Sequence, residues 1–226
     1  MDIIRTKEAF LEGQLLLIDK PLTWTSFQVV NKMRWAIRKE FDIKKIKVGH
    51  AGTLDPLATG LMLICTGRMT KQIEQFMGMP KTYTGSFRLG ATTPSYDLET
   101  SVSDPKPTDH ISAAMLEEVR AGFLGNIQQK PPIYAAIKKD GKRLYTLARA
   151  GKTIEIPSRE VQITDFELTD VNMPDVSFSV SCSKGTYIRS LAHDFGQKLG
   201  CGAHLTSLKR TAIGSYPLSA ALTLDA

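Results

Sequence analysis

Apolar and polar residues follow two different periods along the chain, which predicts a mixture of strands and helices. Residues of about 14–19 and 61–65 are short, continuous apolar runs, as expected for buried strands. Residues 82–89 alternate between apolar and polar side chains, as in a strand with one buried face. Further strand-like patterns cover residues of about 153–171, 176–183 and 205–213.

Three other segments show helical spacing. The first begins at Ser26, a residue type that caps helix N-termini, and runs to about residue 40. An amphipathic helix at about 110–124 should end at Gly125, because glycine readily adopts the backbone conformation that ends a helix. A third helix is expected at 186–199. Together these elements predict an α+β fold with a mainly antiparallel or mixed central sheet, flanked by helices and loops.

Length and composition set the size of the core. The chain has 226 residues, of which 42% are hydrophobic, enough for one large domain or two small ones. It contains no internal repeat, low-complexity tract or long linker. We therefore expect a single domain over residues 1–226.

Basic residues exceed acidic ones, which suits a polyanionic partner. The chain has 29 Lys and Arg against 23 Asp and Glu, and its pI is about 9.2. Two stretches concentrate this charge: Arg34, Arg38, Lys39, Lys44, Lys45 and Lys47 in one, and Lys138, Lys139, Lys142, Arg143, Arg149 and Lys152 in the other. Either could be an ordinary solvated face, but two runs with few matching acids favour contact with phosphates.

The cysteines and histidines show no metal-ligand spacing. Cys65, Cys182 and Cys201 are odd in number and form no Cys-x-x-Cys pair, so we expect free, buried thiols and no metal. The N-terminal residues lack the basic and apolar segments of a leader peptide, and no apolar run is long enough to cross a membrane. We expect a cytoplasmic protein that does not bind membranes. Nothing in the sequence requires a partner chain, so we expect a monomer.

The segment 49–60, with the sequence GHAGTLDPLATG, is typical of a loop that presents one carboxylate. Its three glycines permit conformations that a Cβ would forbid, and Pro56 restricts the backbone of Asp55 to extended conformations. An aspartate held in this way can be a nucleophile, a general base, a metal ligand or a simple turn former.

Several separated motifs carry a resemblance to a known family. HAGTLDPLATG at 50–60 is accompanied by LLLIDKP at 15–21, KTY at 81–83, KRLYTLARAG at 142–151, CSKGTYIR at 182–189 and GCGAHLTSLKR at 200–210. In this order they resemble the TruB-type pseudouridine synthases, in a short form without the C-terminal PUA domain. The resemblance spans almost the whole chain and implies the pseudouridine-synthase fold.

The resemblance also implies roles for individual residues. Asp55 matches the catalytic aspartate, and Arg189 matches an arginine that keeps this carboxylate ionised. Tyr83 matches a tyrosine that stacks on the target uracil, and His50 matches a histidine that fills the space left by the extruded base. Tyr187 and Leu208 match residues that line the uracil pocket. Lys20 and Pro21 match residues that support the active-site loop. From the sequence pattern alone, Tyr83, Tyr187 and Leu208 could equally be core residues.

The substrate implied by the resemblance is uridine 55 in the T stem-loop of tRNA, isomerised without a cofactor. The segment at about 126–152 resembles an insertion that contacts RNA, and we expect it to become ordered when RNA binds. Because the chain ends at Ala226, we expect no PUA domain, and the basic stretch at 34–47 could supply grip on the tRNA instead. The segment 91–97 departs from the family pattern, which leaves its roles open.

Two other functions were weighed. A phosphoryl-transfer enzyme using Asp55 would need further acids near the loop or a GxxxxGK[ST] motif, and the sequence has neither. A non-catalytic tRNA-binding or folding protein could retain the same fold. The presence of Asp55, Tyr83 and Arg189 argues against the loss of catalysis.

Overall fold

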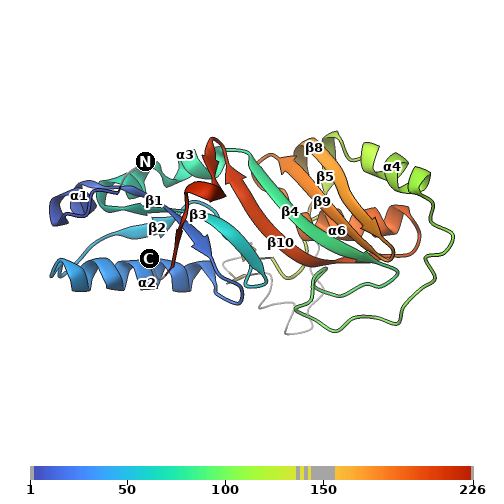
Figure 1. The fold of residues 1–226 in the computed structure, drawn as a ribbon, viewed down its shortest axis with the longest axis horizontal. Coiled ribbons are helices and arrows are strands. Elements are labelled where there is room, and N and C mark those ends of the chain that lie inside the picture. Colours follow the sequence, from blue (N-terminus) through green and yellow to red (C-terminus); the bar gives the residue numbers. More distant parts are fainter. Residues whose placement is uncertain (1–2, 136–137, 140–141, 144–155, 225–226) are drawn as a thin grey trace. The chain divides into compact units, whose positions relative to one another are not determined.

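The computed structural model describes residues 3–135, 138–139, 142–143 and 156–224. The chain divides into two compact units, Met1–Thr84 with Leu208–Ala226, and Gly85–Ser207. It passes between them within two strands, β4 (Lys81–Leu89) and β10 (Ala203–Ile213) (Figure 1). Each unit is described separately below.

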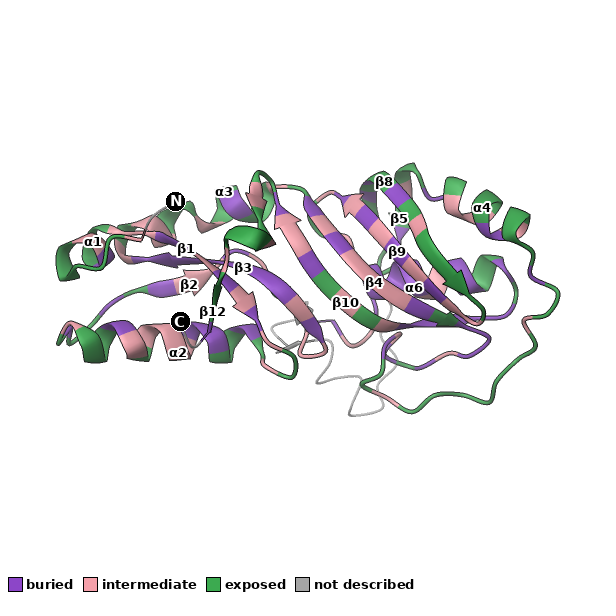
Figure 2. Cartoon of the chain, viewed as in Figure 1, coloured by how far each residue is buried: buried purple, intermediate pink, exposed green. Residues whose placement is uncertain are grey.

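The first unit is built on a mixed sheet. Its strands lie in the order β12 (Leu222–Thr223), β1 (Leu15–Lys20), β3 (Ala58–Thr66), β10 and β4. β1 is antiparallel to β3, whereas β10 is parallel to β3, with Leu208 opposite Ala58. Two short strands lie off this order: β2 (Val48–His50) pairs with β3 and β11 (Tyr216–Pro217) pairs with β10. β3 is buried along almost its whole length, which explains its continuous apolar sequence (Figure 2).

The long helix α2 (Ser26–Glu40) packs on this unit, together with α1 (Lys7–Glu12), the 3-10 helices η1 (Gly67–Gln72) and η2 (Leu218–Ala220), and α3 (Ile73–Gly78). The prediction that Ser26 caps α2 is wrong by one residue. Thr25 is the cap, because its side chain accepts a hydrogen bond from the amide of Gln28 while the Gln28 side chain accepts one from the amide of Thr25. The hydroxyl of Ser26 is thereby available for another contact.

In its described residues, the second unit is a largely antiparallel sheet with the helices α4 (Ala113–Ala121) and α6 (Ile188–Lys198) packed on it. Its strands lie in the order β10, β4, β9 (Asp175–Cys182), β8 (Arg159–Asn172) and β5 (Gly125–Gln129). Five phenylalanines form an aromatic core: Phe87, Phe123, Phe166, Phe178 and Phe195. These observations confirm the predicted α+β fold with a mixed sheet.

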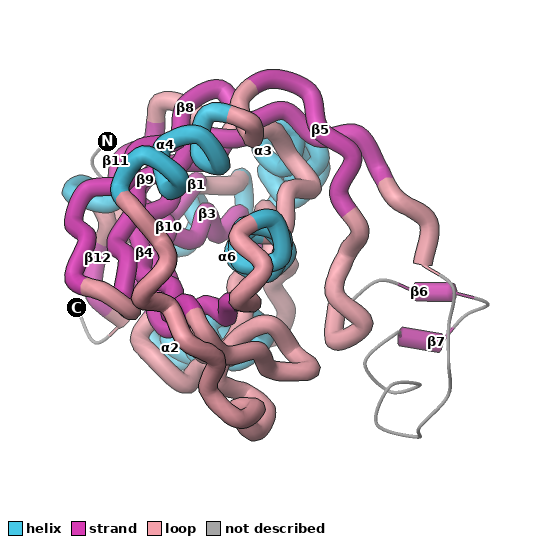
Figure 3. The backbone as a smooth tube through the Cα atoms, turned by 90° about the vertical axis from the view of Figure 1, so that its right-hand side faces the viewer, coloured by secondary structure: helices cyan, strands magenta, loops and turns pink. Residues whose placement is uncertain are grey.

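The ends of two predicted helices are displaced. The helix expected at 110–124 begins at Ala113, after its cap Ser112, and ends at Ala121, so Gly125 begins β5 instead. The helix expected at 186–199 begins at Ile188, because Tyr187 has an extended backbone. Within the segment 126–152, β6 (Lys138–Lys139) and β7 (Lys142–Arg143) form a separate two-stranded sheet (Figure 3). Residues 136–137, 140–141 and 144–152 of this segment lie outside the described residues.

The three cysteines are buried and none of them is in a disulfide, as predicted. None of the helices in the described part of the chain has the length and apolar character needed to cross a membrane.

Phe195 is the centre of the aromatic core, fully buried, with ring centroids 4.9 Å from Phe87 and 6.0 Å from Phe123 and Phe166. We expect Phe195→Ala to lower the free energy of unfolding by about 3–5 kcal/mol in urea titrations, since it removes a buried ring and leaves a cavity. Leu124→Ala, at a side chain that is 42% exposed in the same unit, should cost less than about 1 kcal/mol. Equal losses for the two variants would contradict this account of the core.

Candidate active site

Asp55 lies in a short loop that the sheet closes at both ends. The loop leaves β2 after His50 and enters β3 at Ala58. The amide of Ala51 donates to the carbonyl of Leu63 at 2.9 Å, and the amide of Ala58 donates to the carbonyl of Asp55 at 3.1 Å. Asp55 is therefore part of a hydrogen-bonded turn between two paired strands.

Lys20, at the end of β1, ties this loop to the start of α2. Its side chain is fully buried, and its Nζ donates to three main-chain carbonyls: Trp24 at 2.6 Å, Pro21 at 2.9 Å and Pro56 at 3.4 Å. Burial lowers the pKa of Lys20 to about 8, with the negative charge of Asp55 acting in the opposite direction. Lys20 thus links Pro56, the residue after Asp55, to the segment from Pro21 to Trp24 that precedes α2.

Two further residues hold the loop, and sequence reasoning assigned neither to it. The Ser26 hydroxyl accepts from the amide of Leu54 at 2.8 Å and donates to the carbonyl of the same residue at 3.0 Å. Arg210 is 1% exposed and donates to the carbonyls of Leu61 at 2.7 Å, Gly52 at 3.3 Å and Thr53 at 3.4 Å. The strand that carries Arg210 has the sequence AHLTSLKRTAI, in which polar residues are frequent and Lys209 is also basic, so no local pattern distinguishes Arg210.

Gly60 allows β10 to approach the base of the loop. Its φ is +102°, and a Cβ at this position would lie 2.3 Å from the carbonyl oxygen of Arg210. Gly60 is also the register partner of Arg210 in the β3–β10 pair. A side chain here would push away the strand that carries the arginine.

The first unit also holds three of the predicted substrate-binding residues. His50 is the last residue of β2 rather than a loop residue, and its buried Nδ1 has no hydrogen-bond partner in the described part of the chain. Burial lowers the pKa of His50, a contact with the backbone of Gly52 opposes this, and the nearby Arg210 lowers the pKa further, so the net shift favours a neutral ring. Tyr83 is 9% exposed on β4, and Leu208 is half-buried opposite Ala58.

The second unit holds Tyr187 and fixes its backbone. Gln129, fully buried at the end of β5, accepts from the amide of Tyr187 at 2.7 Å and donates to its carbonyl at 3.0 Å. The guanidinium of Arg159 lies 5.2 Å from the centroid of the Tyr187 ring. Sequence reasoning missed Gln129, because nothing in the local pattern around it indicates this contact.

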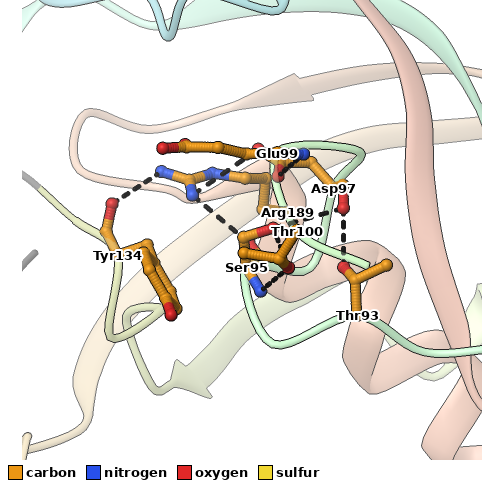
Figure 4. A network of polar contacts seen from close by, with 7 residues as sticks. All are labelled: Thr93, Ser95, Asp97, Glu99, Thr100, Tyr134 and Arg189. Atoms are coloured by element: carbon orange, nitrogen blue, oxygen red, sulfur yellow. Dashed lines mark hydrogen bonds and ion pairs between the residues drawn. The ribbon is translucent and has the colours of Figure 1, made fainter. Parts of the chain in front are cut away.

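Arg189, in the first turn of α6, is 4% exposed. One carboxylate and two main-chain carbonyls contact its guanidinium (Figure 4). Its guanidinium lies 3.6 Å from the carboxylate of Asp97 and donates to the carbonyls of Ser95 at 3.2 Å and Tyr134 at 3.4 Å. Asp97 is itself 5% exposed and accepts from the amide of Glu99 at 2.9 Å. The predicted pairing of Arg189 with Asp55 remains a prediction.

The loop that carries Asp97 has its own supports. The main-chain carbonyl of Asp97 accepts hydrogen bonds from the hydroxyls of Thr93 at 2.6 Å and Ser95 at 3.2 Å (Figure 4). Tyr96 has a positive φ of 65°, and its ring stacks on His193 of α6 with centroids 3.8 Å apart. These contacts assign the segment 91–97, whose roles the sequence left open, to the surroundings of Arg189.

Across the described ranges, no group of three or more His, Cys, Asp or Glu residues is arranged to hold a metal ion. The first unit thus presents a carboxylate on a braced loop, beside a histidine that favours the neutral form. The second presents a buried arginine and a tyrosine with a fixed backbone.

Comparison with family models covers most of the chain. Residues 38–188 match the model for the N-terminal domain of TruB family pseudouridylate synthases. Residues 189–226 match the model described as the C-terminal domain of tRNA pseudouridylate synthase B.

Two curated relatives are similar over nearly their whole length. A tRNA pseudouridine synthase B of Flavobacterium johnsoniae is 57% identical over 220 residues, covering 97% of this chain and 96% of the relative. One of Phocaeicola vulgatus is 51% identical over 216 residues, covering 96% and 92%.

A solved structure of a Cbf5-Nop10-Gar1 complex matches with a TM-score of 0.70 and 28% identity. The match covers 96% of this chain and 53% of that one, so this chain spans about half the length of the solved protein.

The buried ammonium of Lys20 makes stability depend on pH. Its pKa of about 8 in the folded protein lies below the ordinary lysine value of 10.5, so between these two values the unfolded chain binds more protons than the folded one. The free energy of unfolding of the wild type, relative to Lys20→Met, should therefore rise with pH from about 8 to 10, by at most about 1.4 kcal/mol per pH unit. Urea titrations at pH 7, 8, 9 and 10 measure this difference.

Ser26→Ala is the matched control, because it removes a brace of the same loop without removing a titratable group. Its cost should not change with pH. A Lys20→Met difference that is equally flat would contradict the lowered pKa.

The Asp97–Arg189 pair is buried, so breaking it should be costly. We expect Asp97→Asn to lower the free energy of unfolding by about 3–5 kcal/mol, because it removes the charge of Asp97 from a buried ion pair. Asp175→Asn is the control, since Asp175 pairs with Arg88 at 2.6 Å but both side chains are almost half exposed. That change should cost about 1 kcal/mol or less, and similar costs for both variants would show that Arg189 does not depend on Asp97.

Proposed function

Because the chain belongs to the TruB family of pseudouridylate synthases, we propose that it isomerises uridine 55 in the T loop of tRNA to pseudouridine. The observation that carries the proposal is the Asp55 loop. Lys20, Ser26 and Arg210 hold the loop by hydrogen bonds to its main chain. The backbone from which the Asp55 side chain extends is therefore fixed in position. The curated relatives named as tRNA pseudouridine synthases support tRNA as the substrate.

The reaction rearranges bonds within one nucleotide. The N1–C1′ bond breaks, the uracil turns, and a C5–C1′ bond forms, after which C5 loses a proton and N1 carries one. Reactants and product have the same composition, so no oxidant, reductant or cofactor is consumed. Asp55 acts beside C1′, either as the nucleophile that attacks the sugar or as the charge that stabilises its cationic form.

The other residues bind or position the nucleotide. Arg189 keeps the carboxylate of Asp55 ionised, and Tyr83 stacks on the uracil. His50 occupies the space that the extruded base leaves in the RNA, a role that suits a ring favouring its neutral form. Tyr187 and Leu208 line the uracil pocket.

Lys20 and Pro21 support the loop rather than touching the substrate. The contact of Lys20 with the carbonyl of Pro21 and with that of Pro56 supports this role. We expect the protein to act as a cytoplasmic monomer, without a metal ion. A non-catalytic protein that binds or folds tRNA is the alternative that the following experiment addresses.

Asp55→Asn tests the proposal, because it keeps the shape of the side chain and removes the charge. With unmodified tRNA and neither metal nor nucleotide added, it should reduce the rate of pseudouridine formation by at least about 10³-fold. Its Kd for tRNA should stay within a few-fold of the wild type. Base-specific chemical mapping should place the wild-type product at the T-loop uridine.

Asp104→Asn is the control, since it makes the same change at an exposed aspartate of the second unit. It should leave the rate unchanged. Tight binding of tRNA by the wild type without any modification would favour the non-catalytic alternative, and modification at another uridine would refute the T-loop assignment.

A further inference from the structure

The exposed face of α2 combines aromatic rings with positive charge, and we propose that it binds unpaired nucleotides of the tRNA close to the target uridine. This inference rests on the proposed function, because it assigns an additional surface to the same RNA. We call this surface the α2 face and define it by Phe27, Trp35 and Lys39 on the helix and by Lys44, Lys45 and Lys47 in the segment that follows it. All six residues are exposed.

The two aromatic residues lie on one stripe of the helix. Phe27 and Trp35 are separated by eight residues, and with Asn31 and Lys39 they recur at intervals of four, which places them on the same side. Phe27 is 67% exposed and Trp35 57%, whereas Val29, Val30 and Ile37 bury the opposite side of the helix. The rings are spaced by about 12 Å along the axis, enough for each to stack on a different base.

The charge around the rings is suited to phosphate groups. Residues 27–47 contain seven Lys and Arg against two acids, and one of these acids, Glu40, is paired with Arg5 at 3.0 Å. The Nζ of Lys39 lies 4.9 Å from the centroid of the Trp35 ring, so a positive charge and an aromatic surface occur together. Aromatic rings among lysines are typical of surfaces that bind single-stranded nucleic acid.

Not every basic residue here is available for RNA. Arg34 donates to the carbonyl of Val48 at 3.1 Å, and Arg38 donates to the carbonyl of Ile43 at 3.2 Å. These two arginines fix the segment that follows α2. We therefore assign the phosphate contacts to the exposed lysines of the α2 face.

The α2 face begins at the active-site loop, which favours RNA over an acidic protein as its partner. Ser26, the first residue of α2, is hydrogen-bonded to Leu54, the neighbour of Asp55, and Phe27 is the next residue. An RNA whose uridine lies at Asp55 therefore has other nucleotides within reach of Phe27. Trp35 lies further along the same side of the helix.

The test measures the Kd for an unmodified tRNA transcript by fluorescence anisotropy. Phe27→Ala combined with Trp35→Ala should raise Kd by at least about 10-fold, and kcat/KM should fall in parallel, because each lost stack weakens binding. Trp35→Phe keeps an aromatic ring and should stay within about 3-fold of the wild type, whereas Trp35→Leu should lose as much as Trp35→Ala. Changing Lys44, Lys45 and Lys47 to Gln should reduce the slope of log Kd against log salt by about 2–3.

Met77→Ala is the matched control, since Met77 is 46% exposed on α3 of the same unit. Its Kd should equal that of the wild type, and thermal unfolding verifies that all variants are folded. An unchanged Kd in the double variant overturns the inference, and so does an equal effect of Leu and Phe at position 35. If the double variant lost self-association but still bound tRNA, the inference would also be overturned, and the α2 face would be an interface between protein chains.

The two proposals fail in different ways. If the wild type forms pseudouridine but the double variant binds tRNA normally, only the α2 face is wrong. If the wild type forms none, the proposed function is wrong, and the Kd values still decide whether the α2 face binds tRNA.

Discussion

The position of the Asp55 carboxylate depends on two buried cations. Lys20 and Arg210 have almost no exposed surface, and both donate hydrogen bonds to main-chain carbonyls in or beside the Asp55 loop. A buried charge without partners is costly, so each cation requires these carbonyls to stay in place. The loop is rigid because moving it would leave a buried charge without its partners.

The second unit applies the same principle to Arg189 and Tyr187. Asp97 and two carbonyls contact the buried guanidinium, and the Gln129 amide bonds both backbone polar groups of Tyr187. These contacts join segments that are far apart in the chain. Substitution of one member therefore leaves a second buried polar group without a partner, which is costly.

Sequence patterns predicted the elements of this fold better than their contacts. The apolar run in β3 and the helical spacing in α2 follow from burial on a sheet and on a helix face, so periodicity reveals both. The contacts of Ser26 with Leu54, Gln129 with Tyr187, and Arg210 with Thr53 span 28, 58 and 157 residues. No local pattern carries such information, and the roles of Asp55, Tyr83 and Arg189 came from motif resemblance and remain predictions.

Helix α2 connects the rigid site to the surface that we assign to RNA. Its inner side is buried, its N-terminus is closed by a capping box, and its first residue holds the main chain beside Asp55. The outer side projects Phe27 and Trp35 from the same rigid helix. Because the helix is already ordered, RNA that binds there pays little to order the protein backbone. Binding energy gained at the rings is thus available to hold the target nucleotide against the fixed carboxylate.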